Sequence, residues 1–431
     1  MSILIKNANI LTQNSNREIV NGDLYIEDSI ITDLSIKPIN TEADFKLNCK
    51  NKIVLPGLIN THTHVPMTLF RGYSDDMLLN KWLTESIWPI ESKLDNKSIE
   101  IGTKLGVLEM IESGTTTFLD MYFFEDTIGK ISKKFGIRAF LGFAMIDSGT
   151  PEFSSNELII ECEKFIKKWI KNDLITPVIS PHAVYTCGPD LLSKTSDLSS
   201  KYNLLVHTHC CETRDEVYNT QEKFGIRPIE HLGKNGLLNN NMILAHCGWI
   251  TKNEIYELKK HNVKVAHCPI SNMKIGTGAY APIPEMIDSN ILVSLGTDGA
   301  ASNNNLDMFE TMKFCALIHK QHQWNPEILP AQTVLDFSTI NGAASLQREN
   351  DLGSIELGKK ADIIILDCNK SHLVPNHNYI SNIVYAANGN DVDSTIIDGL
   401  PLMLNKELIN IDKNKILEEA ESCAKNLTSG I

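Results

Sequence analysis

The chain has 431 residues, of which 42% are hydrophobic and 22% charged, and its formal net charge at pH 7 is −13. That length predicts two or three domains, or one large barrel with an appended domain. No run of five or six basic residues is present, so we expect neither nucleic acid nor a membrane surface among its partners, because both require concentrated Lys and Arg.

Cysteine usage and the first residues bear on the cellular compartment. Ten cysteines in a chain of this length are too few for a disulfide scaffold, and none form a C-x-x-C pair. The chain begins without a basic region followed by an apolar block, and it has no apolar run of about 18 residues that could span a bilayer. We therefore expect buried, reduced thiols and a cytoplasmic location.

Three zones follow one another along the chain. Residues 1–54 alternate short β-type runs with turn residues. Residues 55–350 alternate short apolar runs, often ending in His or Asp, with segments at helical spacing. From residue 351 onward β-type runs return, and a charged segment near residues 412–425 predicts a closing helix. We expect residues 1–54 and 351–431 to form one small β-sandwich domain together with that helix.

The central zone contains eight candidate strands with helical segments between most of them. Eight alternations over roughly 290 residues favour an α/β fold of the (β/α)8 TIM type over a doubly wound sheet. The strands are expected near residues 57–64, 115–121, 139–145, 176–182, 204–209, 242–247, 264–268 and 292–298. The helices are expected to include residues 99–113, 156–171, 190–202, 252–262 and 306–322.

Polar residues stand at the carboxyl ends of these expected strands. In a (β/α)8 barrel those ends meet on one face, where active sites are built. So many strand-end histidines, together with an aspartate, are hard to explain by core packing alone. The residues are His62, His64, His182, His209, His246, His267 and Asp298.

A metal site is the first prediction from this set. His62 and His64 are two residues apart on a strand, so their side chains point the same way. With His209 and Asp298 they offer three imidazoles and one carboxylate, which suit one Zn²⁺ per subunit, and also Fe²⁺, Mn²⁺ or Ni²⁺. Strand four ends at His182 without a Lys, so the modified lysine that bridges two metal ions has no evident source.

Three residues are candidates for proton transfer. Glu212 follows His209 by three residues, where a carboxyl group can protonate a ring nitrogen of the substrate; alternatively it is an ordinary acid at a helix N-terminus. His246 can polarise the attacking water, or it is a buried structural histidine. Asp298 can bind the metal, take a proton from the water and pass it to the leaving group. The absence of P-C-x-x-C excludes the small cytidine-deaminase-type zinc fold.

Over nearly its whole length the chain resembles the amidohydrolase superfamily, and within it the 5-methylthioadenosine/S-adenosylhomocysteine deaminases. The blocks that carry the resemblance include L-P-G-L-I-N-T-H-T-H (55–64), W-L-T-E-S-I-W-P-I-E (82–91), S-P-H-A-V-Y-T-C (180–187), H-T-H-C-C-E-T (207–213), A-H-C-G-W (245–249), H-C-P-I-S-N-M-K-I-G-T-G (267–278) and L-G-T-D-G-A-A-S-N-N-N (295–305).

The resemblance implies a role for each candidate residue. The metal would be held by His62, His64, His209 and Asp298. Catalysis would use Glu212, His246 and Asp298. The substrate would be bound by Glu91, His182, Glu212, Asp298 and Ser302, with Glu91 accepting the ribose hydroxyls. Without the resemblance, Glu91 would be interpreted as an acid on a helix surface.

The implied reaction is hydrolytic deamination of a 6-aminopurine nucleoside, in which metal-bound hydroxide attacks carbon 6 and ammonia is released. 5-Methylthioadenosine would give 5-methylthioinosine, and S-adenosylhomocysteine would give S-inosylhomocysteine; adenosine is a third candidate substrate. The alternative is a guanine deaminase or a triazine chlorohydrolase-like hydrolase on the same scaffold. A binding protein without activity is disfavoured, because all four metal ligands are present.

One departure from the resemblance concerns the substrate. Relatives that accept S-adenosylhomocysteine often carry Arg after strand three, apparently for the amino-acid carboxylate. Residues 141–152 contain no Arg, and Arg138 at the start of that strand should face away from the site. A carboxylate without a bidentate partner binds less well, which weakens S-adenosylhomocysteine as a substrate. The sequence leaves open the preferred nucleoside, the metal, and the oligomeric state, a homo-oligomer included.

Overall fold

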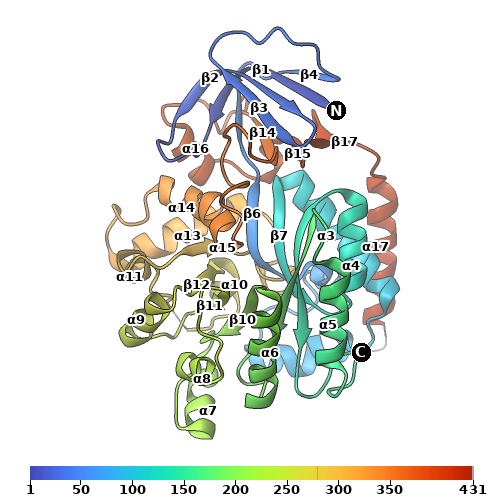
Figure 1. Ribbon diagram of the computed structural model, residues 1–431, viewed down its shortest axis with the longest axis vertical. Helices are drawn as coiled ribbons and strands as arrows, with labels where there is room; N and C mark the ends of the chain where they lie inside the picture. The colour runs from blue at the N-terminus through green and yellow to red at the C-terminus, as the bar shows by residue number, and fades with distance from the viewer. Residues whose placement is uncertain (279, 430–431) are drawn as a thin grey trace.

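The computed structural model describes residues 1–278 and 280–429 of the chain. Its strands form two sheets, an eight-stranded parallel barrel and a nine-stranded mixed sheet. Figure 1 shows the mixed sheet at one end of the molecule, where the blue amino-terminal strands lie beside orange and red carboxyl-terminal ones. Among the described residues, no helix has both the length and the apolar character needed to cross a membrane.

The barrel strands follow one another around the barrel in sequence order, which confirms the predicted (β/α)8 fold. β7 and β8 are buried at every residue, as expected for parallel strands with both faces covered. The ring closes where the backbone N–H of Asp298 donates to the carbonyl oxygen of His62, at 2.9 Å. The strands are β6 (Leu58–Thr63), β7 (Thr115–Tyr122), β8 (Arg138–Met145), β9 (Ile175–Pro181), β10 (Val206–Cys210), β11 (Met242–His246), β12 (Lys264–His267) and β13 (Val293–Leu295).

The barrel helices begin and end at residues whose chemistry specifies those positions. α3 starts at Asp95, which forms a capping box with Ser98, and it ends at Gly114 with a φ of 85°. α9 starts with the same device, formed by Thr251 and Glu254. The longer helices on the barrel are α3 (Asn96–Ser113), α4 (Glu125–Phe135), α5 (Leu158–Trp169), α6 (Pro189–Tyr202), α7 (Arg214–Phe224), α9 (Lys252–Lys260) and α13 (Met308–Gln323).

Shorter helices complete the barrel and the connections around it. They are α1 (Leu79–Lys81), α2 (Trp88–Glu91), α8 (Pro228–Lys234), α10 (Pro269–Lys274), α11 (Ile283–Asp288), α12 (Ala300–Asn303), α14 (Ala331–Phe337), α15 (Ile340–Ser345) and α16 (Tyr379–Tyr385). A π-helical turn, residues 82–87, joins α1 to α2. π-Helical turns are rare and often occur at functional sites.

Both ends of the chain build the mixed sheet, as predicted, and their strands hydrogen-bond in one continuous sheet. The junction is the antiparallel pair β5–β14, in which Val54 lies opposite Ile365. The strands are β1 (Ser2–Leu11), β2 (Ile19–Glu27), β3 (Ile30–Ser35), β4 (Phe45–Asn48), β5 (Lys52–Pro56), β14 (Ile363–Asp367), β15 (Val392–Ile397), β16 (Leu400–Leu404) and β17 (Glu407–Leu408). The expected closing helix is α17 (Lys413–Thr428), which packs against α3 of the barrel.

Arg138 ties the two sheets together. Its side chain is fully buried at the start of β8, where its Nε donates to Oδ2 of Asp362 at 2.8 Å. Its Nη2 lies 3.2 Å from Oδ1 of Asp398, just after β15. Both aspartates belong to the mixed-sheet side of the barrel, so Arg138 faces away from the carboxyl ends of the strands, as predicted.

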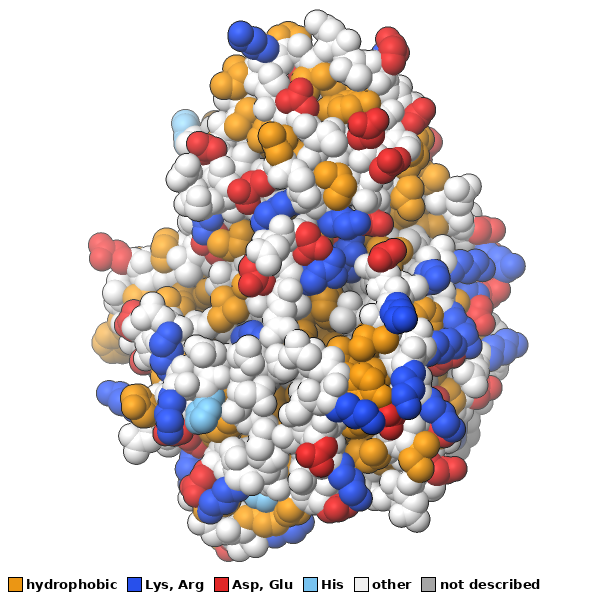
Figure 2. Space-filling view, in the orientation of Figure 1, with side chains coloured by type: hydrophobic (Ala, Val, Ile, Leu, Met, Phe, Trp, Pro, Cys, Tyr) orange, Lys and Arg blue, Asp and Glu red, His pale blue; other side chains and the backbone are white. Residues whose placement is uncertain are grey.

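Basic side chains gather along one edge of the face seen in Figure 2, on the side where Figure 1 places α4 and α5. They are interleaved with acids: Lys130 pairs with Asp126 at 2.7 Å, and Lys167 pairs with Glu163 at 2.8 Å. These pairs neutralise part of the local charge, and exposed pairs of this kind contribute little to stability.

Candidate active site

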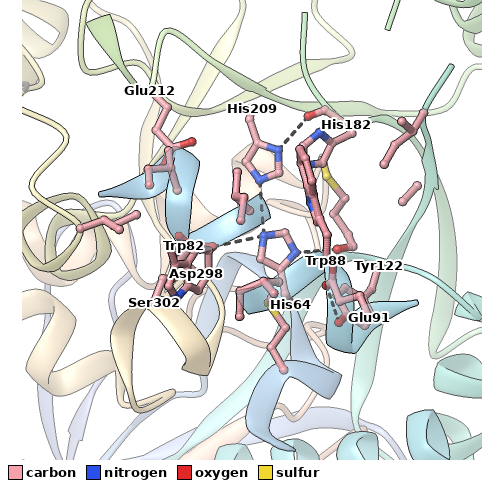
Figure 3. A pocket seen from close by; sticks show the side chains of 18 of the residues that line it. His64, Trp82, Trp88, Glu91, Tyr122, His182, His209, Glu212, Asp298 and Ser302 are labelled. Carbon is pink, nitrogen blue, oxygen red and sulfur yellow. Dashed lines mark hydrogen bonds and ion pairs between the residues drawn. The ribbon is translucent and has the colours of Figure 1, made fainter. Parts of the chain in front are cut away.

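A cavity of about 720 Å³ lies at the carboxyl ends of the barrel strands (Figure 3). This volume includes the open mouth of the pocket. Polar and apolar side chains share the lining. The polar residues include His64, Glu91, His182, His209, Glu212, His246, Asp298 and Ser302. The apolar and aromatic residues include Met67, Trp82, Leu83, Ile87, Trp88, Tyr122, Phe123, Ala144 and Ile146.

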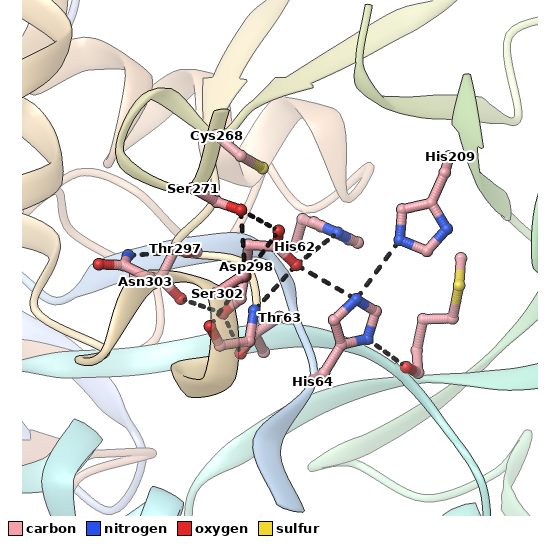
Figure 4. A network of polar contacts seen from close by, with 12 residues as sticks. His62, Thr63, His64, His209, Cys268, Ser271, Thr297, Asp298, Ser302 and Asn303 are labelled. Carbon is pink, nitrogen blue, oxygen red and sulfur yellow. Dashed lines mark hydrogen bonds and ion pairs between the residues drawn. The ribbon is translucent and has the colours of Figure 1, made fainter. Parts of the chain in front are cut away.

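The four predicted metal ligands come together at one side of this cavity (Figure 4). Nε2 of His62 and Nε2 of His64 lie 3.4 Å and 3.2 Å from the same atom, Oδ1 of Asp298. Nε2 of His209 lies 3.4 Å from Nε2 of His64. Burial favours a neutral Asp298, but the neighbouring imidazoles outweigh it and hold the pKa of this carboxyl well below its usual range.

Hydrogen bonds at the other ring nitrogens orient two of these histidines. Nδ1 of His64 lies 2.6 Å from the carbonyl oxygen of Met121, and Nδ1 of His209 lies 2.7 Å from that of His182. A carbonyl oxygen only accepts, so both Nδ1 atoms carry the proton. Metal-binding imidazoles are held in this way, with Nδ1 donating to a backbone carbonyl so that Nε2 is the atom left for the metal.

His62 is oriented by a second histidine that the sequence analysis did not single out. Nδ1 of His62 lies 2.7 Å from Nε2 of His207, and Nδ1 of His207 lies 3.2 Å from the carbonyl oxygen of Ile243. His207 therefore carries its proton on Nδ1 and accepts from His62. The spacing of His207 and His209 repeats that of His62 and His64, and this repeat is the signal that could have found it.

Nε2 of His62 supports the interpretation of the cluster as a metal site. This buried atom has no hydrogen-bond partner among the described residues. A buried polar atom without a partner is costly, so it calls for an explanation. Its lone pair lies beside the nitrogens of the other histidines and Oδ1 of Asp298. A divalent ion bound at this cluster would account for it.

Asp298 is held by its neighbours in a strained conformation. Its Oδ2 accepts hydrogen bonds from Ser271, at 2.5 Å, and Ser302, at 3.1 Å. Its φ is 63°, in the left-handed region, which costs about 1–3 kcal/mol for residues other than glycine. Ser302, predicted to contact the substrate, lines the cavity and also fixes this carboxylate.

Glu212 and His246 face each other next to the metal ligands. Oε1 of Glu212 lies 3.9 Å from Nε2 of His246, whose Nδ1 lies 2.9 Å from Oδ1 of Asn272. The Nδ1 of His246 donates to this amide oxygen, and the ligand atom of His246 lies within 4.8 Å of those of His62 and His209. Burial raises the pKa of Glu212, which favours its protonated form.

Glu212 lies directly before α7 but does not cap it. The N-cap is Thr213, whose side chain accepts from the backbone N–H of Glu216. Glu216, in the first turn of α7, was not singled out from the sequence. Its buried carboxylate accepts from the backbone N–H groups of Cys211, at 2.9 Å, and Glu212, at 2.8 Å.

Glu91 and His182 also line the cavity, from different elements. Glu91, at the end of α2, is only 7% exposed, so it is no helix-surface acid. Its Oε1 accepts from the hydroxyl of Tyr122 at 2.7 Å, and burial raises the pKa of Glu91 to about 7. His182 follows β9, and its Nδ1 lies 2.9 Å from Oγ1 of Thr186.

His267 is a strand-end histidine with no contact to the proposed metal ligands among the described hydrogen bonds. The structure places it outside the cavity lining, with its Nε2 3.1 Å from Nε2 of His319 on α13. No site role was predicted for His267, and its contact is with α13. Position at a strand end does not decide whether a side chain faces the cavity or the surrounding helices.

Comparison with known proteins identifies the family of this chain. Residues 53–402 match the amidohydrolase family. A 5-methylthioadenosine/S-adenosylhomocysteine deaminase of Thermococcus onnurineus is 44% identical over 410 residues, which are 95% of each chain. A 5'-deoxyadenosine deaminase of Methanobrevibacter smithii is 41% identical over 428 residues, 99% of this chain and 98% of that one.

A solved structure has the same fold over almost the whole chain. An adenosine deaminase from Xanthomonas campestris with bound zinc superposes with a TM-score of 0.95 and 30% identity, covering 99% of this chain and 98% of the other. The resemblance seen in the sequence motifs is thereby confirmed. The chain belongs to the amidohydrolase family.

Proposed function

We propose that the protein is a metal-dependent hydrolase that deaminates adenosine-type nucleosides at carbon 6 of the purine and releases ammonia. Relatives over 40% identical along almost the whole chain carry names of such deaminases. The observation that carries the proposal is a cluster in which Nε2 of His62 and Nε2 of His64 lie beside Oδ1 of Asp298, Nε2 of His209 lies 3.4 Å from that of His64, and the buried carboxyl group of Glu212 lies close by.

The metal would be one divalent ion per subunit, held by His62, His64, His209 and Asp298. The donor set favours Zn²⁺ among the candidates, since it combines imidazoles and a carboxylate, and the Xanthomonas campestris structure contains zinc. The chemistry that such an ion supplies when bound is a water molecule acidified to a pKa of about 7.

The protein's own residues move the protons of the reaction. Glu212, protonated because of its burial, donates to the ring nitrogen next to carbon 6 as the oxygen of water bonds to that carbon. His246 accepts a hydrogen bond from this water at Nε2. Asp298 takes the proton lost by the water and gives it to the amino group. The carbon–nitrogen bond then breaks, ammonia leaves, and the proton remaining on the new oxygen returns to Glu212, which gives the inosine-type product.

Glu91 would bind the ribose. An ionised carboxylate accepts hydrogen bonds from two neighbouring hydroxyl groups, and such charge-assisted bonds are stronger than neutral ones. The hydroxyl of Tyr122 occupies one side of Oε1 and so orients the carboxylate. A substrate without ribose, such as guanine or a triazine, has no ribose hydroxyl groups to donate to Glu91.

We further propose that the preferred substrates carry an uncharged 5' substituent. The described residues that line the cavity include no Lys and no Arg, while Phe123, Ala144 and Ile146 supply apolar surface. A methylthio or methyl group fits that surface. The carboxylate of S-adenosylhomocysteine would enter without a cationic partner, which costs binding energy.

Localisation in the cytoplasm is also a proposal. All ten cysteines are free thiols in the structure, and most of them are buried. Reduced thiols are typical of a reducing compartment.

The test is incubation of the zinc-loaded enzyme with 5-methylthioadenosine, 5'-deoxyadenosine, adenosine and S-adenosylhomocysteine, followed by measurement of ammonia and of the adenine absorbance band. We expect ammonia from the first two at the highest kcat/KM. Glu212→Gln should lower kcat by a factor of at least about 100, while the metal content stays at one ion per chain. No ammonia from any nucleoside, or loss of the metal from this variant, would contradict the proposal.

A further inference from the structure

A second cluster of metal-ligating side chains lies outside the cavity. His267 ends β12, and Cys315 and His319 lie one turn apart on the same face of α13. One ligand atom from each residue lies within 4.8 Å of the other two, and all three side chains are buried. The two imidazoles approach most closely, with their Nε2 atoms 3.1 Å apart.

Both imidazoles are uncharged, as imidazoles that bind metals are. Burial lowers the pKa of His267 well below its usual value and that of His319 to about 3, so both rings are neutral. Two neutral rings facing each other through Nε2 share one proton. A metal ion that replaces this proton would bind both Nε2 atoms, and Nδ1 of His319 would donate to the hydroxyl of Tyr280, 2.7 Å away.

We propose that His267, Cys315 and His319 form a second metal site, for a thiophilic ion with a filled d shell, Cu⁺ or Zn²⁺. Two imidazoles and a thiolate suit these ions, whereas Mg²⁺ and Ca²⁺ require oxygen ligands. Binding of the ion releases the Cys315 proton to solvent, since the thiolate is the ligand. The site is chemically distinct from the catalytic cluster, whose four proposed ligands include no cysteine.

Charge favours Cu⁺ over Zn²⁺. Among the described residues, the hydrogen bonds of His267 and His319 join them to each other and to Tyr280, and no carboxylate takes part. One thiolate neutralises Cu⁺ completely but leaves a net positive charge around Zn²⁺. An uncompensated charge is costly in buried surroundings, so we expect Cu⁺ to bind more tightly.

The ion would connect β12, the seventh barrel strand, to α13. Ser271 follows His267 closely in the sequence and donates a hydrogen bond to the carboxylate of Asp298. The proposed site is therefore linked to the catalytic centre by a short segment of chain. Because an ion that binds only the folded state stabilises it, occupancy should raise the midpoint of thermal unfolding.

The experiment uses the full chain with its catalytic metal in place. The enzyme is titrated without oxygen with Co²⁺, as an absorbing substitute for Zn²⁺, and separately with Cu⁺. We expect one further ion per chain, a thiolate-to-metal charge-transfer band and a raised thermal midpoint. Binding of Co²⁺ alone assigns the site to Zn²⁺, and binding of Cu⁺ alone assigns it to copper.

Variants tie the result to these three residues. Cys315→Ala and His319→Gln should each lose the further ion, the band and the thermal shift, while circular dichroism confirms that they fold. Cys162→Ala removes an equally buried thiol from α5 and should behave like the unchanged protein. Absence of a further ion in the unchanged protein, or an ion and band that persist in both cluster variants, would overturn the proposal.

Discussion

The backbone N–H of Glu212 donates a hydrogen bond to the carboxylate of Glu216, with 2.8 Å between nitrogen and Oε2. The other oxygen of Glu216 accepts from the N–H of Cys211, a residue with a φ of 53°. The two bonds hold the strained turn after β10 that aims the Glu212 side chain at His246. Glu216 thus acts on catalysis through the position of Glu212, without contacting the substrate.

Glu216→Gln should lower kcat and leave KM nearly unchanged. The amide group of Gln keeps one acceptor oxygen but turns an N–H toward the second backbone donor, so one of the two bonds is lost. Loss of a bond to a charged group costs about 1.5–3 kcal/mol, which corresponds to a drop in kcat of roughly tenfold or more. Steady-state kinetics and metal analysis measure this; the metal content should stay at one ion per chain.

Glu222→Gln is the matched control, because Glu222 is an exposed residue of the same helix. It should retain the kinetics of the unchanged enzyme. If Glu216→Gln also retained its kcat, the turn would not depend on Glu216, and this positioning role would be wrong.

The KM for the nucleoside should fall as the pH rises through about 7. Burial raises the pKa of Glu91 from 4.5 to about 7, against the opposing effects of Tyr122 and His64, so this carboxyl group ionises in the neutral range. Only the ionised form accepts hydrogen bonds from both ribose hydroxyls through free oxygen atoms. In Glu91→Gln the KM should be high and independent of pH between about 6 and 8; a KM in this variant that still falls with pH would exclude Glu91 as the titrating group.

The same group should change stability in a defined pH window. A carboxyl group whose pKa is higher in the folded state favours folding while it is protonated. Its contribution is complete below the ordinary pKa of 4.5 and is lost as the pH rises through about 7. Urea unfolding of the unchanged protein should therefore show a loss of stability relative to Glu91→Gln across this window, and a constant difference between the two would contradict the raised pKa.

His207→Ala should weaken metal binding without removing a ligand. His207 fixes the proton of His62 on Nδ1 and leaves Nε2 free for the ion. Loss of a residue that hydrogen-bonds to a metal-binding histidine lowers the metal affinity by about 10–100-fold. Competition with a chelator measures the affinity, with the half-exposed His261 changed to Ala as the control. Unchanged affinity in His207→Ala would show that the ring of His62 is held in place by packing alone.

Ile146→Arg should shift the preference toward S-adenosylhomocysteine. Ile146 lines the cavity, which contains no cationic side chain among its described lining residues. A charge-assisted bond to the substrate carboxylate is worth about 1.5–3 kcal/mol, or at least about tenfold in relative kcat/KM. Ile146→Met, of similar volume, controls for size. No change in the ratio of kcat/KM for S-adenosylhomocysteine and 5-methylthioadenosine would place the 5' substituent elsewhere in the cavity.

Much of the fold was predictable because it depends on local patterns. After Arg138, β8 is a continuous apolar run, and α3 and α9 begin at residues with capping side chains, so hydrophobic pattern and capping locate them. The strand-end positions of His62, His64, His209 and Asp298 follow from the barrel, because its geometry brings these ends to one face.

The parts that the sequence did not reveal depend on contacts between distant elements. The bond between Tyr122 and Glu91 and the pairing of His62 with His207 require the exact packing of several strands and helices. His267 shows the limit of strand-end reasoning: β12 has only four residues, and rotation of its last side chain toward α13 depends on tertiary packing.

Turnover of 5-methylthioadenosine by the zinc-loaded enzyme in isotopically labelled water tests the central claim most directly. Mass spectrometry of the product and an ammonia assay give the result. The account predicts 5-methylthioinosine with one labelled oxygen at carbon 6 and one ammonia per product molecule, and no turnover by Asp298→Asn. Release of ammonia without label at carbon 6, or full activity in Asp298→Asn, would contradict it.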